Sequence, residues 1–500
     1  MNALKLLLLT LFMIIPISNG SGGGDKSSSS IEGLWITTEE TSSRFLSGTQ
    51  KILLRIHTDS NKKWTVRGVF LWNGDYQSEW KLVNMHYDTI SHHITILDED
   101  SDTLKCIMDA KNDRLIGAVY LQSKTKNSLN FLRASNNLES RLFHPRLPDI
   151  HGNIYCGYNN PEQLDDGIET TSIYDENIDT LSVIKLIKDI INQKYGRMES
   201  ILILKDNKLI LEEYFYGYHR AHLHKIYSCT KSITSLLFGM VLERNKQIDL
   251  NQSIFSFFSE YDSLKTSAKE RITLKHILTM TSGLQWHEYP KEMYELSDRI
   301  KYVLSRPIEA KPGEKFLYNS GGSIVIGGVI TSFVGKQVKA FADKFLFGPL
   351  GITNYVWKTY KNGDLEYWNG LQLLPRDMAK IGLLVLNDGR WQNKQIVSKE
   401  WIRESTRPHV RESDYFNYGY QWWHRSQHNH QWWKEPHSAS SEEHDMVIAL
   451  AWGGQYIMVI KDLNLVVVTT ASDYDDGNKA RSKFPMVIEE IVPIFEDARL

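Results

Sequence analysis

The sequence contains little cysteine. Only Cys106, Cys156 and Cys229 occur in 500 residues, which excludes a small domain held together by a framework of disulfides. A bond between Cys106 and Cys156 stays open at this stage, because nothing in the sequence demands it. Cys229 follows a candidate nucleophile, Ser228, but one helical step turns it away, so we interpret it as a small buried residue.

Recognised metal-binding patterns are also missing. The chain contains no Cys-x-x-Cys, no His-Glu-x-x-His and no calcium-loop pattern. Two His-x-His pairs, His222/His224 and His428/His430, have a metal-like spacing, but no third ligand accompanies them. We interpret these histidines as solvated loop residues, and we predict neither a metal nor an organic cofactor.

The chain has no excess of charge of one sign. Lys and Arg number 58 against 60 Asp and Glu, for a formal net charge of -2. This balance argues against nucleic acid as the main partner. We expect a small-molecule or peptide substrate, and the sequence leaves the oligomeric state open.

The first twenty residues carry an apolar run that is short for a bilayer. Lys5 precedes the run from Leu6 to Ile17, and the small residues Ser18 and Gly20 follow it. This order predicts a signal peptide over residues 1–20, with a permanent anchor as the alternative. Residues 21–30 then form a flexible linker. We therefore expect a secreted or periplasmic protein without a stable membrane span.

The length predicts two or more domains. Residues 31–145 alternate apolar and polar residues in short runs such as KILLRIHT, separated by turn signals at Asn73-Gly74 and at Lys111-Asn112-Asp113. About seven or eight strands at this spacing predict an all-β, barrel-like domain or a sandwich. The opening Gly33-Leu34-Trp35 resembles lipocalin-like barrels. Such a domain either binds a ligand in its mouth or acts as a spacer or docking module.

The second region, 150–500, mixes helices and strands. LSVIKLIKDIINQKYG has helical spacing, and two strands are expected on either side of Asp206-Asn207. Further on, a serine and a lysine three residues apart open a helix that runs to about Asn245. Its apolar residues fall on one face: Ile233, Leu236, Leu237, Met240 and Val241.

Ser228 and Lys231 are neighbours on the first turn of this helix. A desolvated lysine there has a lowered pKa and can act as a base toward the serine. The spacing alone is common in this chain, and Ser182/Lys185 also opens a helix. Only Ser228 is followed by companion motifs: a helix over 271–286 closed by Ser282-Gly283, and Tyr318, whose phenol can move a proton or simply pack in a core.

Several blocks in order carry a resemblance to a known family. These blocks are YSCTKSITSLLFGMVLERNKQIDL, ITLKHILTMTSGL, the Pro-Gly block that ends in Tyr318, and residues 370–402. Together they resemble the penicillin-recognising serine hydrolases, in the branch of class C β-lactamases, D-alanyl-D-alanine peptidases and esterases. The resemblance covers roughly residues 180–490. It implies an α+β domain, in which an antiparallel sheet flanked by helices meets an all-helical subdomain at the site.

The resemblance assigns the first motif to Ser228 and Lys231, and the second to Tyr318. The third position of that second motif is Ser320, where the family's usual amide is missing unless Asn319 turns inward. The third motif, usually Lys/His-Thr-Gly, has no match. Trp452-Gly453-Gly454 stands in its place and resembles the variant of esterase-like and amidase-like members.

Glycines allow a backbone to approach a substrate carbonyl, so we predict that the amides of Ser228 and Gln455 hold the oxyanion. The missing cation argues against carboxylate-bearing substrates such as penicillin. The tryptophans of the C-terminal half form either a hydrophobic cleft or ordinary core packing. They are Trp422, Trp423, Trp432, Trp433 and Trp452.

These features predict a secreted serine hydrolase that cleaves esters or amides through an acyl-enzyme on Ser228. One alternative is a D-alanyl-D-alanine peptidase or β-lactamase acting on cell wall or penicillins, which would need a cation near Trp452, such as Arg425 or Lys434. Another is a catalytically silent binding or sensor protein of the same fold. The intact Ser228, Lys231 and Tyr318 argue against the silent protein.

Overall fold

In a computed structural model, the chain folds into two compact units. One unit comprises Met1–Cys156 with Tyr214–His219, and the other comprises Gly157–Glu213 with Arg220–Leu500. The predicted signal peptide and linker lie outside the described residues. Within the described residues, no single helix meets the length and apolarity needed to cross a membrane, although one sharply bent pair of helices passes on those two criteria. The structure describes Ile31 and residues 33–37, 50–58, 63–72, 75–80, 82–98, 103–120, 126–133, 156–215, 218–288, 290–425, 444–474 and 476–497.

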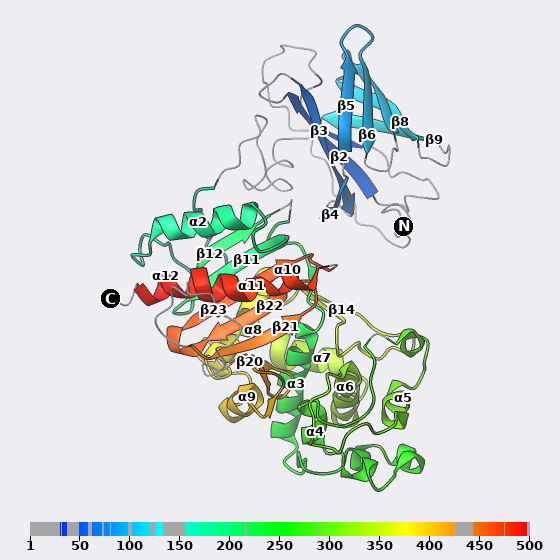
Figure 1. Ribbon diagram of the computed structural model, residues 1–500, viewed down its shortest axis with the longest axis vertical. Coiled ribbons are helices and arrows are strands. Elements are labelled where there is room, and N and C mark those ends of the chain that lie inside the picture. Colours follow the sequence, from blue (N-terminus) through cyan, green and yellow to red (C-terminus); the bar gives the residue numbers. More distant parts are fainter. Residues whose placement is uncertain are drawn as a thin grey trace. The chain divides into compact units, whose positions relative to one another are not determined.

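The N-terminal unit is a nine-stranded antiparallel sheet in the order β4-β3-β2-β1-β9-β8-β7-β6-β5. Strand β1 pairs with both β2 and β9, and β3 also runs close to β5, so the sheet curls as the barrel-like prediction requires (Figure 1). The strands are β1 (Gly33–Thr37), β2 (Gln50–Thr58), β3 (Trp64–Trp72), β4 (Asp75–Trp80), β5 (Leu82–Asp88), β6 (His93–Asp98), β7 (Thr103–Asp109), β8 (Arg114–Tyr120) and β9 (Lys126–Arg133).

Alternation of side chains places the core of this sheet on one face. Along β7, Leu104, Cys106 and Met108 are buried while Lys105 and Ile107 are exposed, the period of two that a half-buried strand shows. The turn predicted at Lys111-Asn112-Asp113 joins β7 to β8, whereas Asn73-Gly74 lies outside the described residues. The likeness to lipocalins stays a prediction.

The second unit contains another nine-stranded sheet, in the order β10-β12-β11-β23-β22-β21-β20-β19-β18. Strand β10 runs parallel to β12, and the ladders from β11 to β18 are antiparallel. Asp206-Asn207 joins β11 to β12 with positive φ at both residues, as predicted. The strands are β10 (Glu169–Thr170), β11 (Met198–Lys205), β12 (Lys208–Tyr214), β18 (Val410–Arg411), β19 (Asn417–Tyr418), β20 (Trp423–Arg425), β21 (Met446–Ala451), β22 (Gln455–Ile460) and β23 (Leu465–Ala471).

Helices cover both faces of this sheet. Helix α8 packs against β11, β22 and β23, and α2 and α12 cover the opposite face (Figure 1). This two-sided cover explains why β22 and β23 are buried along their whole length and mostly apolar. These helices and the smaller strands are α2 (Thr180–Ile191), α8 (Pro375–Leu386), α9 (Lys399–Thr406), α10 (Gly477–Arg481), α11 (Lys483–Pro485), α12 (Val492–Asp497), β13 (His224–Lys225), β14 (Val356–Trp357), β15 (Leu371–Leu373), β16 (Arg390–Trp391) and β17 (Lys394–Gln395).

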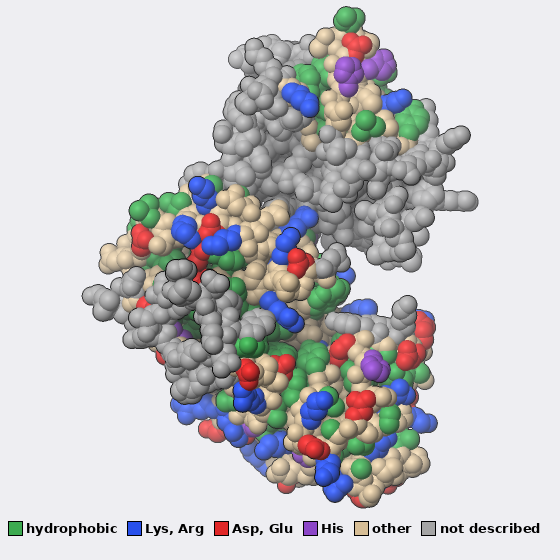
Figure 2. All heavy atoms as spheres, in the orientation of Figure 1, with side chains coloured by type: hydrophobic (Ala, Val, Ile, Leu, Met, Phe, Trp, Pro, Cys, Tyr) green, Lys and Arg blue, Asp and Glu red, His purple; other side chains and the backbone are tan. Residues whose placement is uncertain are grey.

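A helical subdomain is built around α6, which contacts α3, α4, α5 and α7. On the face that Figure 2 shows, positive and negative side chains are interspersed over this subdomain. Its helices are α3 (Cys229–Arg244), α4 (Leu274–Leu278), α5 (Arg299–Ser305), α6 (Ser320–Val334) and α7 (Val338–Ala342). Together with the flanked antiparallel sheet, it confirms the predicted α+β architecture.

Helix α3 has the predicted extent but not the predicted single apolar face. Every residue from Cys229 to Val241 is buried, because α3 packs against α6, α9 and the sheet strands β21 and β22. Two of its buried polar residues bond to neighbouring segments: the Ser232 hydroxyl donates to the carbonyl of Gln421 at 2.7 Å, and the Thr234 hydroxyl donates to the carbonyl of Tyr367 at 2.9 Å. Polar positions therefore do not mark a solvent face here.

The helix predicted over 271–286 is much shorter. Only α4 is helical, with Thr273 as its capping residue. The chain leaves the helix at Met280, whose φ is +56°, and the carbonyl of Met280 accepts the Leu317 N–H at 2.8 Å. This tertiary hydrogen bond replaces a further turn of helix and brings the segment before Tyr318 alongside α4.

Candidate active site

Ser228 stands directly before α3. Tyr227 has a left-handed φ of +42°, and Ser228 itself has helical angles. The Ser228 side chain makes no capping hydrogen bond to the helix. Instead, its Oγ accepts hydrogen bonds from Lys231 Nζ at 3.0 Å and from the Tyr318 hydroxyl at 3.1 Å. Two groups able to carry a proton therefore converge on one serine oxygen.

Lys231 is 1 % exposed. Its ammonium nitrogen also donates to the carbonyl of Trp368 at 3.1 Å and lies 5.2 Å from the centre of the Tyr318 ring. Burial lowers the pKa of Lys231 to about 8, while the carboxylate of Glu288 acts in the opposite direction. The lysine can therefore exist as a neutral amine close to physiological pH.

Tyr318 is held by packing on both sides. Leu317 is hydrogen-bonded to Met280, and the Tyr318 ring stacks on Trp423, with 5.9 Å between the centres and 22° between the planes. Trp423 in turn contacts Phe316 and Tyr418. The phenol hydroxyl is thereby fixed over Ser228 although 90 residues separate the two along the chain.

The glycines of the altered third motif turn a β-hairpin. Strand β21 leads through Trp452-Gly453-Gly454 into β22, and the two glycines have φ of +80° and +95°. A Cβ on Gly453 would lie 2.3 Å from the ring of Tyr474. Only glycine combines this backbone conformation with such a close approach.

Gln455 begins β22 beside the start of α3. Its carbonyl accepts a hydrogen bond from the Cys229 thiol at 3.4 Å, and its side-chain oxygen accepts the Ala471 N–H at 3.3 Å. The backbones of Ser228 and Gln455, which carry the two predicted oxyanion amides, are thus brought close together. Cys229 is buried and desolvation raises the pKa of its thiol strongly, so it remains protonated and is no rival nucleophile.

The tryptophans divide between core and site. Trp452 is 49 % exposed, and its ring contacts Tyr227 at 5.5 Å and Tyr474 at 5.1 Å between centres. Trp422 is fully buried, whereas Trp423 lies against Tyr318. Trp432 and Trp433 lie outside the described residues. An aromatic wall therefore borders Ser228 on the hairpin side, and Trp422 belongs to the core.

Asn319 and Ser320 are both engaged by the protein. Asn319 is buried and caps α6, since its side-chain oxygen accepts the Gly322 N–H at 3.2 Å, so its amide does not replace the missing one. Ser320 donates its N–H to Glu288 Oε1 at 2.9 Å and its hydroxyl to Oε2 at 2.5 Å. Sequence reasoning missed Glu288, because no motif or periodicity connects it to Ser320, 32 residues away.

A cation that lies close to the hairpin is neither of the two candidates. Arg425 lies in β20 and its pKa is lowered to about 10 by burial, and Lys434 lies outside the described residues. Lys483 of α11 instead approaches the hairpin, with Nζ 3.2 Å from where a Cβ on Gly454 would lie. It is fully buried and forms an ion pair with Asp473, so its charge is already compensated.

The histidines and cysteines of the described residues form neither a three-ligand metal site nor a disulfide. His224 is not a solvated loop residue: it is 4 % exposed, its Nδ1 lies 3.0 Å from Glu199 Oε2, and its ring contacts that of His222. His428 and His430 lie outside the described residues. Within the described part of the chain, His, Cys, Asp and Glu form no group of three that could hold a metal. All three cysteines are free thiols.

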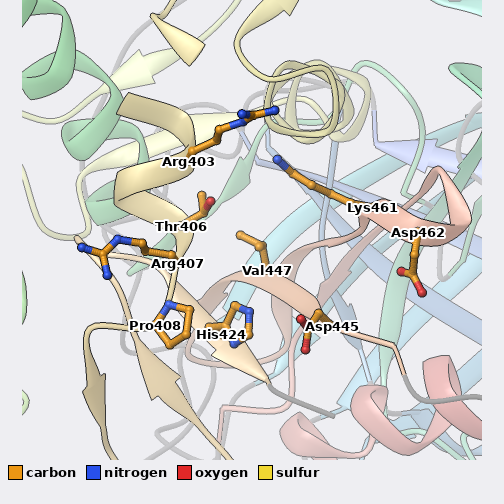
Figure 3. A pocket seen from close by; sticks show the side chains of 9 residues that line it. All are labelled: Arg403, Thr406, Arg407, Pro408, His424, Asp445, Val447, Lys461 and Asp462. Atoms are coloured by element: carbon orange, nitrogen blue, oxygen red, sulfur yellow. The ribbon is translucent and has the colours of Figure 1, made fainter. Parts of the chain in front are cut away.

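A separate hollow of about 430 Å³ lies at the other end of β21 from the hairpin (Figure 3). Its cations are largely paired, since Arg403 and Lys461 both bind Asp388 and Arg407 binds Glu404. The hollow is thus distinct from the site around Ser228. It is lined by Arg403, Thr406, Arg407, Pro408, His424, Asp445, Val447, Lys461 and Asp462.

Residues 196–486 match the family model described as Beta-lactamase. The chain belongs to the β-lactamase family. This is a family of serine hydrolases, and the fold and the convergence on Ser228 agree with it.

Solved structures agree on the fold of this β-lactamase-family domain. A "Putative 6-aminohexanoate-dimer hydrolase from Bacillus anthracis" superposes with a TM-score of 0.53 at 19% identity, covering 68% of this chain and 91% of that one. A "putative beta-lactamase from Bacteroides dorei DSM 17855" gives the same TM-score at 17% identity, covering 64% and 99%. At these identities the likeness shows the fold alone.

A curated relative from Salmonella agona (strain SL483) is named "Putative D-alanyl-D-alanine carboxypeptidase". It is 19% identical over an alignment of 191 residues that covers 33% of this chain. The chain spans 44% of the length of that relative.

Proposed function

We propose that this β-lactamase-family chain is a serine hydrolase that forms an acyl-enzyme on Ser228 and acts on esters or unactivated amides. The observation that carries the proposal is the pair of proton-carrying groups on Ser228 Oγ, with Lys231 at 3.0 Å and Tyr318 at 3.1 Å. A protein that only bound ligands would have no chemical need for this arrangement.

The proposed first half-reaction follows from these contacts. Neutral Lys231 accepts the Ser228 proton as Oγ attacks the carbonyl, and the Ser228 and Gln455 amides stabilise the oxyanion. The Tyr318 hydroxyl, 3.1 Å from the serine oxygen, delivers its proton to the leaving alcohol or amine and becomes a phenolate. Water then attacks the acyl-enzyme and gives its proton to the Tyr318 phenolate. As the acid leaves, Lys231 returns its extra proton to Ser228 Oγ, so that all three groups regain their starting state.

Two features of the site support esters or amides over penicillins. Lys483, the cation that the described residues place beside Gly454, is already paired with Asp473 and so is not free to hold a carboxylate. At the second motif, both Ser320 donors go to the carboxylate of Glu288. A substrate carboxylate would therefore meet negative charge where an amide usually stands.

A D-alanyl-D-alanine peptidase is the second candidate. The name of the Salmonella relative suggests it, and Lys483 offers a cation close to Gly454. It would require Lys483 to exchange Asp473 for the carboxylate of the substrate. Hydrolysis of a D-alanyl-D-alanine peptide that is lost in Lys483→Met, while ester hydrolysis persists, would favour this candidate.

We also propose that the chain is exported, on the evidence of the charged, apolar and small-residue order within residues 1–20. Mass spectrometry of the protein recovered from the medium or periplasm of an expressing bacterium tests this. An N-terminus near residue 21 is expected, and an intact Met1 on protein retained in the cytoplasm would contradict it.

The experiment that tests the enzyme is intact-protein mass spectrometry after exposure to a fluorophosphonate probe. One adduct is expected on the wild type and none on Ser228→Ala. Ser182→Ala is the matched control, because Ser182 also precedes a lysine by three residues but hydrogen-bonds to Asp179 at the surface. A folded wild type without an adduct, or an adduct retained in Ser228→Ala, would refute the proposal.

A further inference from the structure

Glu288 lies in a segment that is fixed against the beginning of α6. Leu284 pairs with Ile308 in a β-bridge, and the N–H of Gln285 donates to the carbonyl of Pro307 at 2.9 Å. Trp286 packs on Gly321 so closely that a Cβ there would lie 2.6 Å from its ring. The position of Glu288 relative to the second motif is therefore built into the packing.

The carboxylate of Glu288 accepts hydrogen bonds from the backbone N–H and from the hydroxyl of Ser320. Both donors of Ser320 go to it, at 2.9 and 2.5 Å. A carboxylate offers about four lone-pair positions, so these two bonds leave it able to accept more. Ser320 is 1 % exposed, whereas Glu288 is only partly buried. A substrate arriving at this position thus meets the carboxylate before the hydroxyl.

The negative charge of this group reaches the catalytic centre. Its field acts on Lys231 and on the buried Tyr418, which itself borders Tyr318. Among the side chains that the structure describes, no lysine or arginine forms an ion pair with Glu288. The carboxylate is therefore a charged group beside the nucleophile with capacity left for a ligand.

We propose that Glu288 selects substrates that carry a positive charge, an ammonium or guanidinium group, close to the scissile carbonyl, and that it rejects substrates with a carboxylate there. A charge-assisted hydrogen bond would hold the cation, and like-charge repulsion disfavours the anion. The inference rests on the proposed hydrolase activity and specifies its substrate class.

The test compares wild type and Glu288→Gln on matched esters. One set contains p-nitrophenyl esters whose acyl chain ends in an ammonium, a methyl or a carboxylate group. Each end group is tested on a short and on a long acyl chain. A second set consists of acetate esters whose alcohol carries one of the same three groups, and their hydrolysis is measured by the acid that is released. Glu295→Gln is the control, because Glu295 follows seven residues later in the chain as a 71 % exposed carboxylate paired with Lys361.

We expect wild type to favour the ammonium ester in at least one set. Glu288→Gln should lower the ratio of kcat/KM for the ammonium ester to kcat/KM for the methyl ester by about tenfold to a hundredfold, the range of one hydrogen bond to a charged group. It should raise the ratio of kcat/KM for the carboxylate ester to kcat/KM for the methyl ester. Glu295→Gln should change neither ratio. Ratios that stay the same in Glu288→Gln, with all three esters equally affected, would overturn the inference and leave Glu288 as a support for α6.

Failure of the proposed function gives a different result. In that case no ester is hydrolysed in a Ser228-dependent manner and no fluorophosphonate adduct forms. Should Glu288→Gln not fold, protection of wild-type Ser228 from the probe decides the question. Alkylammonium ions should slow labelling more than alkylcarboxylates of equal length, and equal or reversed protection would overturn the inference.

Discussion

Burial of Lys231 makes its protonation state the main determinant of the expected pH dependence. If neutral Lys231 accepts the Ser228 proton, kcat/KM for a neutral ester should rise with pH and level off above a midpoint near 8, the pKa that burial gives this lysine. The sign follows from the direction of the change: a lowered pKa means that the amine loses its proton at lower pH than an ordinary lysine does.

The lowered pKa makes far more of the protein active at neutral pH. With a pKa of about 8, roughly one molecule in eleven carries the neutral amine at pH 7, and with the ordinary 10.5 only about three in ten thousand do. Burial therefore increases the active fraction at pH 7 by about 300-fold. A solvated lysine at this position would leave the enzyme nearly inactive at neutral pH.

The assay is the initial rate of p-nitrophenyl ester hydrolysis at subsaturating substrate, measured across the pH range in which the protein stays folded. Glu288→Gln provides a second check, because its carboxylate favours the charged lysine, and removing it should move the midpoint to lower pH. A profile that is flat from pH 6 to 9, or one whose midpoint lies above pH 10, would refute this reasoning for Lys231.

Two further predictions concern stability and the hairpin. Lys231→Met should abolish activity yet raise the free energy of unfolding at pH 7 by about 1–3 kcal/mol, because burying the charge costs about 3 kcal/mol and the lost hydrogen bonds offset part of the gain. In urea unfolding, this gain in stability should fade between pH 8 and 10.5, where the lysine of the unfolded wild type loses its charge as well. A variant less stable than wild type at pH 7 would contradict the prediction. Gly453→Ala should lower the free energy of unfolding by about 1–3 kcal/mol and reduce kcat/KM, since φ is +80° and the Tyr474 ring lies 2.3 Å from the new Cβ. A variant with the thermal stability and rate of wild type would show that the hairpin tolerates a side chain.

Local patterns account for the parts of the fold that could be predicted. The end of α3 at Asn245, the turn at Asp206-Asn207 and the apolar strands β22 and β23 each follow from residues close together in the chain. Where tertiary contacts overrode local pattern, the prediction was wrong. The helix expected over 271–286 shrank to α4 because Met280 bonds to Leu317, and His224 is buried by Glu199.

The sequence by itself determined that Ser228 and Lys231 are neighbours, because three residues make nearly one turn of a helix. It also carried the ordered blocks that resemble the serine hydrolases. Only the tertiary structure decided what surrounds this pair. It places the Tyr318 hydroxyl, 90 residues away, on Ser228, it brings the Gln455 carbonyl to the Cys229 thiol, and it sets the carboxylate of Glu288 on Ser320. Such contacts depend on how distant segments pack against one another, and no short-range periodicity encodes that packing.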